Sequence, residues 1–345
     1  MKKTALITGV TGQDGAYLSE LLIEKNYKVF GCFRRTSTSN FWRLIELDII
    51  NHTNFNLIEH DITDPFNSIE ILKKTRPDEI YNLAAQSFVG TSFTHPNTTS
   101  QINAVGTLNL LEAIRIVNPG IKFYQASTSE MFGKIQEEKQ SETTPFYPRS
   151  PYAVAKLFAH WITINYRESY GLFASAGILF NHESPLRGPE FVTRKITIGA
   201  AKCKLGIAQT LLLGNLDAKR DWGYAKDYVK GMWKILQINS PENFVLATGK
   251  NQTVRDFAKL AFSAAGFSID FEGKNEKEVG IDVKTGKTLI KVDPKFYRPA
   301  EVEVLLGNAS KAFSKLGWKP ETTLENLANM MVDADLRRLQ ETERK

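Results

Sequence analysis

Tyr152 and Lys156, four residues apart, are the pair in this chain whose types and spacing most directly suggest chemistry. On a helix, positions i and i+4 share one face. A lysine ammonium held near a phenol favours the phenolate and so lowers the pKa of the tyrosine. A tyrosine tuned in this way can take a proton from a sugar hydroxyl near neutral pH. Alone the pair is a weak signal, because an ordinary amphipathic helix can carry a surface tyrosine and lysine.

Thr128 and Glu130 precede that pair by about a helix length, within the segment 125–133. The threonine can hydrogen-bond the same hydroxyl, and the glutamate supplies a second base for a neighbouring carbon. Residues 122–127 are predicted to form a strand, and ligands bind at the C-terminal ends of strands in open α/β sheets. The catalytic set that we expect is Thr128, Glu130, Tyr152 and Lys156.

Near the N-terminus, an apolar run at 4–8, a glycine-containing loop at 9–15 and an amphipathic pattern over 17–23 predict a strand, a turn and a helix. Glycines permit a tight turn and close backbone approach to a pyrophosphate, which the helix N-terminus then faces. A glycine trio is often only a turn, and Gly-x-x-Gly-x-x-Gly is not the standard spacing, but the flanking strand and helix are what a dinucleotide site requires. The loop residues expected at the cofactor are Gly9, Thr11, Gly12, Gln13, Asp14 and Gly15.

The second predicted strand, residues 28–33, is followed by Arg34 and Arg35. A site for NAD usually has an Asp or Glu at this point, which binds the ribose hydroxyls. Guanidinium groups instead suit a 2′-phosphate, so the pair favours NADP over NAD. The alternative is that both arginines are simply solvated at a strand end.

Strands and helices alternate through the first half of the chain with short connections, which implies an α/β fold with a doubly wound parallel Rossmann sheet. The further strands are predicted at 56–62, 79–83, 122–127 and 173–180, and the helices at 70–75 and 97–117. A last helix is predicted at 323–339. We expect an NADP-binding domain at 1–180, with a segment of about 214–240 folding back onto it, and a smaller, mixed substrate-binding domain at 181–345.

Other segments offer candidate ligand contacts. Asp61 near the end of the third strand is expected at the adenine edge, and small residues at 84–87 would let a cofactor approach the backbone. Cations in the short polar segments 191–195, 219–222 and 297–299 suit a diphosphate. The alternative for these lysines and arginines is an ordinary place on the surface.

Composition narrows the class of protein. The 345 residues carry a net charge of +6 without a run of five basic residues, which disfavours nucleic acid as a partner and suits a small anionic ligand. Only Cys32 and Cys203 are present, which excludes a disulfide framework and fits a reducing cytoplasm. The apolar run near the N-terminus is too short for a signal peptide, and no segment reaches membrane-spanning length, so no membrane association is expected.

Over nearly its whole length the sequence resembles the extended short-chain dehydrogenase/reductase family and, within it, the GDP-mannose 4,6-dehydratases. Epimerases of the family carry Ser-Ala-Thr where this chain has Thr128-Ser129-Glu130, and many dTDP-glucose dehydratases carry Thr-Asp-Glu there. Glu130 therefore indicates a dehydratase, and Ser129 the GDP-mannose branch. The segments that carry the resemblance are 8–15, 124–133, 143–156, 178–188, 192–195, 213–228, 244–249 and 296–301.

The resemblance implies a role for each site residue and no metal. Tyr152 would be the base for the sugar 4-hydroxyl, with Lys156 lowering its pKa and holding the nicotinamide ribose. Thr128 would orient that hydroxyl, and Glu130 would remove the C5 proton. The implied cofactor site contains Gly9, Gly12, Gly15, Arg34, Asp61, Ile62, Leu83, Ala84, Ala85, Gln86, Ser87, Lys156, His182 and Arg187. The implied GDP-sugar site contains Ser87, Thr128, Glu130, Tyr152, Asn181, Val192, Arg194, Lys195, Gly214, Arg220, Arg298 and Glu301.

The implied reaction is redox-neutral: a GDP-manno sugar becomes a 4-keto-6-deoxy sugar, with tightly bound NADP recycled within each turnover by a homo-oligomer, a tetramer or a dimer. GDP-mannose is the default, and a GDP-D-glycero-manno-heptose is the alternative substrate. More distant alternatives are a GDP-sugar 4-reductase or epimerase, which need no C5 base, and a dinucleotide-sensing scaffold without chemistry. The positions that depart from the family pattern are Phe41, Trp42, Thr98 and Leu186.

Overall fold

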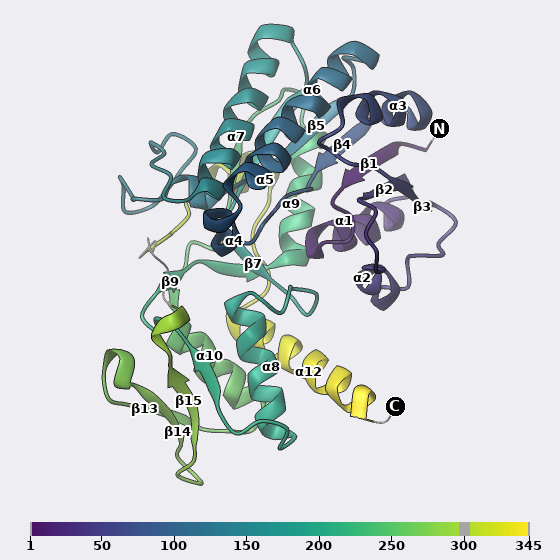
Figure 1. Cartoon of the computed structure of the whole chain (residues 1–345). Helices are drawn as coiled ribbons and strands as arrows, with labels where there is room; N and C mark the ends of the chain where they lie inside the picture. Colours follow the sequence, from purple (N-terminus) through teal and green to yellow (C-terminus); the bar gives the residue numbers. More distant parts are fainter. Residues whose placement is uncertain (1, 297–303, 344–345) are drawn as a thin grey trace.

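The computed structural model describes residues 2–296 and 304–343, and its larger part is built on a seven-stranded sheet (Figure 1). All neighbouring strands in this sheet run parallel, so the predicted doubly wound parallel sheet is confirmed. In spatial order the strands are β11 (Phe244–Leu246), β6 (Ala174–Leu179), β5 (Lys122–Thr128), β4 (Glu79–Asn82), β1 (Thr4–Thr8), β2 (Lys28–Phe33) and β3 (Phe55–Glu59).

The strand order reverses between β1 and β4. The chain runs outward from β1 through β2 to β3, then returns to add β4 on the other side of β1. A reversal of this kind leaves a crevice at the carboxyl ends of the strands, where ligands bind in open α/β sheets. The glycine loop follows β1, the small-residue loop follows β4 and Thr128 ends β5, so the predicted site residues gather at this edge.

Side chains of β1 alternate between two cores, one on each face of the sheet. Ala5 and Ile7 belong to one core and Leu6, between them, to the other, and all three are fully buried. Because both faces are covered, the strand reads as a continuous apolar run. The covering helices are α1 (Gln13–Glu24) and α9 (Ala225–Gln237) on the first face, and α3 (Pro65–Thr75), α6 (Gly106–Val117) and α7 (Pro151–Tyr170) on the second.

A further apolar core, separate from the two that flank the large sheet, lies in the lower part of Figure 1, between a small mixed sheet and three helices. We propose that this core marks the substrate domain, and that the chain returns to the first domain for α9 and β11. The strands of the small sheet are β13 (Ile269–Glu272), β14 (Val279–Asp282), β15 (Thr288–Val292) and β8 (Leu211–Leu213). The helices are α8 (Val192–Lys204), α10 (Val254–Ala264) and α12 (Leu324–Glu343).

The helix predicted at 97–117 is interrupted. It forms α5 (Pro96–Ser100), a π-helical turn η1 (Gln101–Val105) and then α6. Asn103, in the π turn, accepts a hydrogen bond from Gln86 N at 2.8 Å and donates to Gln86 O at 3.0 Å. π turns often occur at functional sites, and this one fixes the backbone of the loop after β4.

Element ends differ from the sequence prediction by a few residues. The third strand stops at Glu59, and α3 begins at Pro65, where Asp64 caps the helix by accepting from Phe66 N at 2.9 Å. Within the described ranges, no helix has the length and apolar character needed to cross a membrane. The remaining elements are α2 (Trp42–Glu46), α4 (Val89–Thr94), η2 (Ser129–Met131), β7 (Asn181–Glu183), β9 (Lys219–Arg220), β10 (Trp222–Tyr224), β12 (Gln252–Thr253), η3 (Asn275–Lys277), η4 (Pro294–Phe296) and α11 (Ser310–Leu316).

Candidate active site

The end of β5 and the start of α7 bring the predicted catalytic residues together. Thr128 ends β5, and its hydroxyl accepts a hydrogen bond from Glu130 N at 3.2 Å and also bonds to Tyr152. α7 begins at Pro151, a residue favoured at this position, and Ser150 Oγ caps it by accepting from Ala153 N at 3.1 Å. This cap fixes the first turn, which carries the tyrosine.

Lys156, one turn further along α7, is buried and donates from Nζ to the backbone carbonyl of Ala126 on β5 at 3.0 Å. The bond joins the helix to the strand directly behind the site. Burial lowers the pKa of Lys156 to about 8, although the charge of Asp14 opposes that shift.

Tyr152 does not have the lowered pKa that its spacing from Lys156 predicts. Burial raises the pKa of Tyr152 to about 12. The hydrogen bond with Thr128 and the positive charge of Arg187 act in the opposite direction, while the Glu130 carboxylate adds to the increase. The physical reason is that removing a phenol from water disfavours its charged form, and the Lys156 ammonium points at a carbonyl.

The glycine loop and the loop after β4 approach each other at the crevice. Gly9 has φ +70°, and a Cβ there would lie 2.8 Å from Ala84 Cα. A Cβ on Gly15 would lie 2.5 Å from Gly9 O, so the start of α1 can pack on the loop only without a side chain. Thr8 Oγ1 accepts from Leu83 N and from Ala84 N, each at 3.1 Å, which fixes the second loop. This close-walled loop at a helix N-terminus fits the pyrophosphate of a dinucleotide.

The side chains of Gln13, Asp14 and His182 have a structural role that the sequence did not predict. Asp14 Oδ2 lies 2.8 Å from His182 Nε2, and Gln13 Nε2 donates to His182 O at 3.1 Å. The imidazole also stacks on Tyr228 with 4.6 Å between ring centroids. Burial opposes charge on the histidine, but the Asp14 carboxylate raises the pKa of His182 above its usual value. These bonds join the start of α1 to β7 at the edge of the predicted cofactor site.

At the predicted adenine end, Arg34 and Arg35 are exposed just after β2. The carboxylate of Asp61 accepts from Thr63 N at 3.0 Å and from Thr63 Oγ1 at 2.7 Å, so it closes a turn. Its neighbour Ile62 is buried. In the loop after β4, Ala85 and Gln86 are half-buried and Ser87 is exposed.

Asn181, where β7 begins, carries a buried side-chain oxygen that could accept a hydrogen bond from a ligand. Its Oδ1 is buried and has no hydrogen-bond partner among the described residues. A buried acceptor without a partner is costly, and a donor from a bound molecule would relieve that cost. Asn181 follows β6 directly, beside the end of β5, which agrees with the predicted place at the sugar nucleotide.

A second group of predicted substrate residues gathers around η4. The Nζ of Lys195 lies 3.4 Å from the ring centroid of Phe296, and a Cβ on Gly214 would lie 2.8 Å from Phe296 O. Val192, at the start of α8, is partly exposed. Arg298 and Glu301, the next predicted contacts along the chain, lie outside the described residues.

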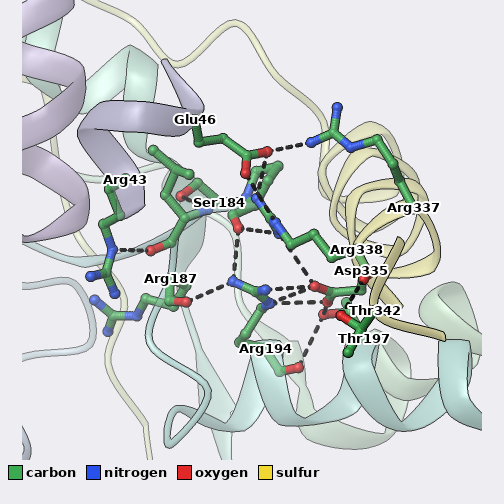
Figure 2. A network of polar contacts seen from close by, with 12 residues as sticks. Arg43, Glu46, Ser184, Arg187, Arg194, Thr197, Asp335, Arg337, Arg338 and Thr342 are labelled. Atoms are coloured by element: carbon green, nitrogen blue, oxygen red, sulfur yellow. Dashed lines mark hydrogen bonds and ion pairs between the residues drawn. The ribbon is translucent and has the colours of Figure 1, made fainter. Parts of the chain in front are cut away.

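Arg194 was predicted to bind substrate, and its geometry argues against that role. Its guanidinium is buried and pairs with Asp335 on α12 at 2.6 Å through Nη2 (Figure 2). Arg187 was predicted at the cofactor. Its guanidinium lies 3.6 Å from the ring centroid of Phe191, and its Nε is 3.1 Å from Glu183 Oε2. Arg220 is buried and donates from Nη1 to Lys219 O at 2.8 Å.

The positions that depart from the family pattern are spread over the fold. Phe41 packs edge-on against Phe33 at 5.0 Å between centroids. Trp42 lies under the guanidinium of Arg43 at 4.3 Å, Leu186 is buried and Thr98 is exposed on α5.

Asp221 is a buried residue of the site that sequence analysis missed. Its Oδ1 accepts from Thr248 N at 2.8 Å, and its Oδ2 accepts from Gly249 N at 2.8 Å and Gly307 N at 3.4 Å. It thereby joins Arg220, the loop after β11 and the segment that follows Glu301. The only sequence signal was an acidic residue between Arg220 and Trp222. The described residues hold no group of three or more His, Cys, Asp or Glu side chains that could bind a metal.

Comparison with known proteins gives full-length similarity to one family. A family model described as GDP-mannose 4,6 dehydratase matches residues 6–331. The GDP-mannose 4,6-dehydratase of Yersinia enterocolitica is 53% identical over 349 residues, with 97% of this chain and 94% of that protein covered. The GDP-mannose 4,6 dehydratase of Homo sapiens is 52% identical over 342 residues, with 97% and 92% covered.

Solved structures of lower identity share the fold. A dTDP-glucose 4,6-dehydratase from Streptomyces venezuelae, with NAD bound, has a TM-score of 0.83 at 20% identity and covers 98% of each chain. RMD from Pseudomonas aeruginosa, complexed with NADPH, has a TM-score of 0.76 at 23% identity and covers 98% of this chain and 100% of its own. At these identities the likeness concerns the fold alone.

Replacing Asp221 with Asn should lower the free energy of unfolding by about 1–3 kcal/mol, because the amide nitrogen cannot accept the bonds from Gly249 N and Gly307 N. Urea denaturation of the two proteins measures this difference. Asp217→Asn is the matched control, since it breaks an exposed ion pair with Arg255 and should cost less than about 1 kcal/mol. Equal losses in the two variants would show that Asp221 does not hold these loops.

Proposed function

The chain belongs to the GDP-mannose 4,6-dehydratase family, and we propose that it removes water from GDP-mannose to give the GDP-4-keto-6-deoxy sugar. The observation that carries this proposal is the meeting of four side chains beside the switch point of the sheet. They are Thr128, Glu130, Tyr152 and Lys156. The relatives named for this activity give no support to a heptose as the substrate.

In the proposed reaction, Tyr152 takes the proton of the sugar 4-hydroxyl while Thr128 hydrogen-bonds that oxygen. The chemistry that NADP would supply when bound is reversible hydride transfer, first from C4 and then to C6, so no external oxidant would be consumed. The ketone at C4 makes the C5 hydrogen acidic. Glu130 removes that proton and protonates the departing 6-hydroxyl, which leaves as water. When hydride returns to C6, C5 takes a proton that comes from solvent, which completes the 4-keto-6-deoxy sugar.

The raised pKa of Tyr152 sets a condition on this mechanism. A buried phenol with a pKa of about 12 holds its proton near neutral pH, so the site must stabilise the phenolate when the proton leaves. Thr128, by its hydrogen bond, and Arg187, by its charge, are the described groups that lower the pKa of Tyr152. We therefore assign electrostatic support of the base to Arg187.

Glu130→Gln should block dehydration and leave nucleotide binding nearly unchanged, because the amide cannot accept the C5 proton. Loss of a positioned general base costs roughly 10²–10⁴-fold in rate. Turnover is followed by mass spectrometry of GDP-mannose for loss of water, and in deuterated water the parent enzyme should label C5 of the product. Glu138→Gln, which changes an exposed carboxylate nearby, is the control. Near-normal turnover of the Glu130→Gln variant would remove Glu130 from the mechanism.

We propose NADP as the preferred cofactor. Arg34 and Arg35 are exposed at the end of β2, and the positive charge of Arg34 acts on Asp61 beside it. A guanidinium at this place can bind the 2′-phosphate that distinguishes NADP from NAD. Because the reaction is redox-neutral, the cofactor need not leave between turnovers, and we expect it to remain bound.

Arg34→Ala should weaken NADP binding about tenfold or more and change NAD binding less than about twofold, because only NADP has the 2′-phosphate. Isothermal titration of cofactor-free protein with each dinucleotide measures both affinities. Arg115→Ala, which removes an exposed arginine from α6, should alter neither. An equal loss for both cofactors would contradict the assignment.

We propose that the protein is a homo-oligomer, a dimer or a tetramer, that assembles through α7. Val154, Phe158 and Trp161 project from the helix at helical spacing and are 56%, 43% and 54% exposed. Exposed apolar side chains that cluster on one helix face mark interaction sites more often than scattered ones do.

We also propose a cytoplasmic location, since Cys32 and Cys203 are free thiols.

Trp161→Glu should shift the protein toward the monomer, because it puts a charge into the apolar face of α7. Light scattering after size-exclusion chromatography gives the mass of each form. Phe66→Glu provides the control, since Phe66 is 78% exposed on α3 and lies outside the proposed interface. A mass for the Trp161 variant that equals that of the parent would rule out this face as the main interface.

A further inference from the structure

The loop at residues 185–187, between β7 and α8, has every one of its backbone carbonyls bound by an arginine side chain (Figure 2). Arg43, on α2, donates from Nε to Leu186 O at 2.7 Å. The same guanidinium donates from Nη1 to Thr11 O, in the glycine loop, at 3.0 Å. One side chain therefore sets the spacing between this loop and the predicted phosphate-binding loop.

Two arginines from the substrate domain hold the rest of the loop. Arg194, on α8, donates from Nη1 to Pro185 O at 2.7 Å and to Arg187 O at 2.8 Å. Arg338, on α12, donates from Nη1 to the same Pro185 carbonyl at 2.8 Å. We call Arg43, Arg194 and Arg338 the arginine clamp. Its members come from three helices, so the loop position depends on how those helices pack.

Two carboxylates pair with two of the three clamp arginines, Arg194 and Arg338. Asp335 is only 2% exposed, pairs with Arg194 at 2.6 Å and lies 3.4 Å from Arg338. Glu46, on α2, accepts from Arg338 Nη2 at 3.0 Å and also pairs with Arg337. A buried guanidinium is tolerated only when it is paired and hydrogen-bonded. The pairs therefore fix the directions in which Arg194 and Arg338 point.

The loop carries Arg187, the cation proposed for the cofactor site. Its backbone carbonyl is in the clamp, and its guanidinium lies flat on Phe191 and beside Glu183. Its positive charge lowers the pKa of both Asp14, in the glycine loop, and Tyr152, so it acts on the site from this position. Moving the loop would move that charge.

We propose that the arginine clamp positions Arg187 against the phosphates of the bound dinucleotide, so that α12 of the substrate domain contributes to cofactor affinity through the loop 185–187. This inference rests on the proposed function, because it assumes that the crevice binds NADP. The clamp residues are positioning residues. A loop that is already fixed in its binding conformation loses less conformational entropy when the ligand binds.

The test compares Arg338→Gln with Arg337→Gln. Both variants remove one positive charge from adjacent positions of α12 and one ion pair with Glu46. Among the described residues, only Arg338 of the two bonds to Pro185 O. Titration of cofactor-free protein with NADPH, followed by nicotinamide fluorescence, should show about tenfold weaker binding for Arg338→Gln and less than about twofold for Arg337→Gln. The value of kcat at saturating NADP should stay within about twofold for Arg337→Gln, which leaves the loop and Arg187 in place.

Arg43→Lys is the second variant, in case Arg338→Gln fails to fold. It keeps the charge but cannot reproduce the two bonds to Leu186 O and Thr11 O, so NADPH binding should again weaken several-fold. Urea denaturation of each variant separates loss of affinity from loss of stability. The clamp proposal would be overturned, and the proposed function would stand, if the parent and both clamp variants bound NADPH equally well. The same conclusion would follow if Arg337→Gln weakened NADPH binding as much as Arg338→Gln does. Failure of the parent itself to bind NADPH would overturn the proposed function and this inference with it.

Discussion

At the carboxyl edge of the sheet, the glycine loop and the loop after β4 approach so closely that no side chain fits between their backbones. A Cβ on Gly9 would lie 2.8 Å from the backbone of Ala84, and one on Gly15 would lie 2.5 Å from Gly9 O. This steric constraint brings the start of α1 next to the loop after β4. The other parts of the site are arranged around the crevice that results, because β5 and α7 border it.

Burial dominates the electrostatics of the catalytic pair. It raises the pKa of Tyr152 and lowers that of Lys156, so the protein interior favours the neutral form of both groups. Charges supplied by other parts of the chain then decide how easily the tyrosine loses its proton. The positive charge of Arg187 lowers the pKa of Tyr152 and the carboxylate of Glu130 raises it, and both residues belong to the proposed site.

The second half of the chain contributes to both parts of the fold. α9 and β11 complete the first domain, Asp221 joins three segments beside Arg220, and α12 reaches back to α2 through Arg338 and Glu46. These contacts connect residues that lie far apart in sequence, as in the pair of Arg194 and Asp335, separated by 141 positions. The bond from Arg338 to Glu46 therefore joins the part of the chain that contains the small mixed sheet to the part built on the seven-stranded sheet.

The sequence by itself determined the features that depend on short-range spacing. The glycine loop between β1 and α1, the position of Thr128 at a strand end and the shared face of Tyr152 and Lys156 all follow from local patterns, as does the parallel sheet. Only the tertiary structure decided that Arg194 pairs with Asp335, that Asp221 is buried among three segments and that the pKa of Tyr152 is raised. The spacing of residues along the chain fixes which of them share a helix or strand. Burial and charged partners arise only when folding brings distant segments together, and they set the protonation and hydrogen bonding of each side chain.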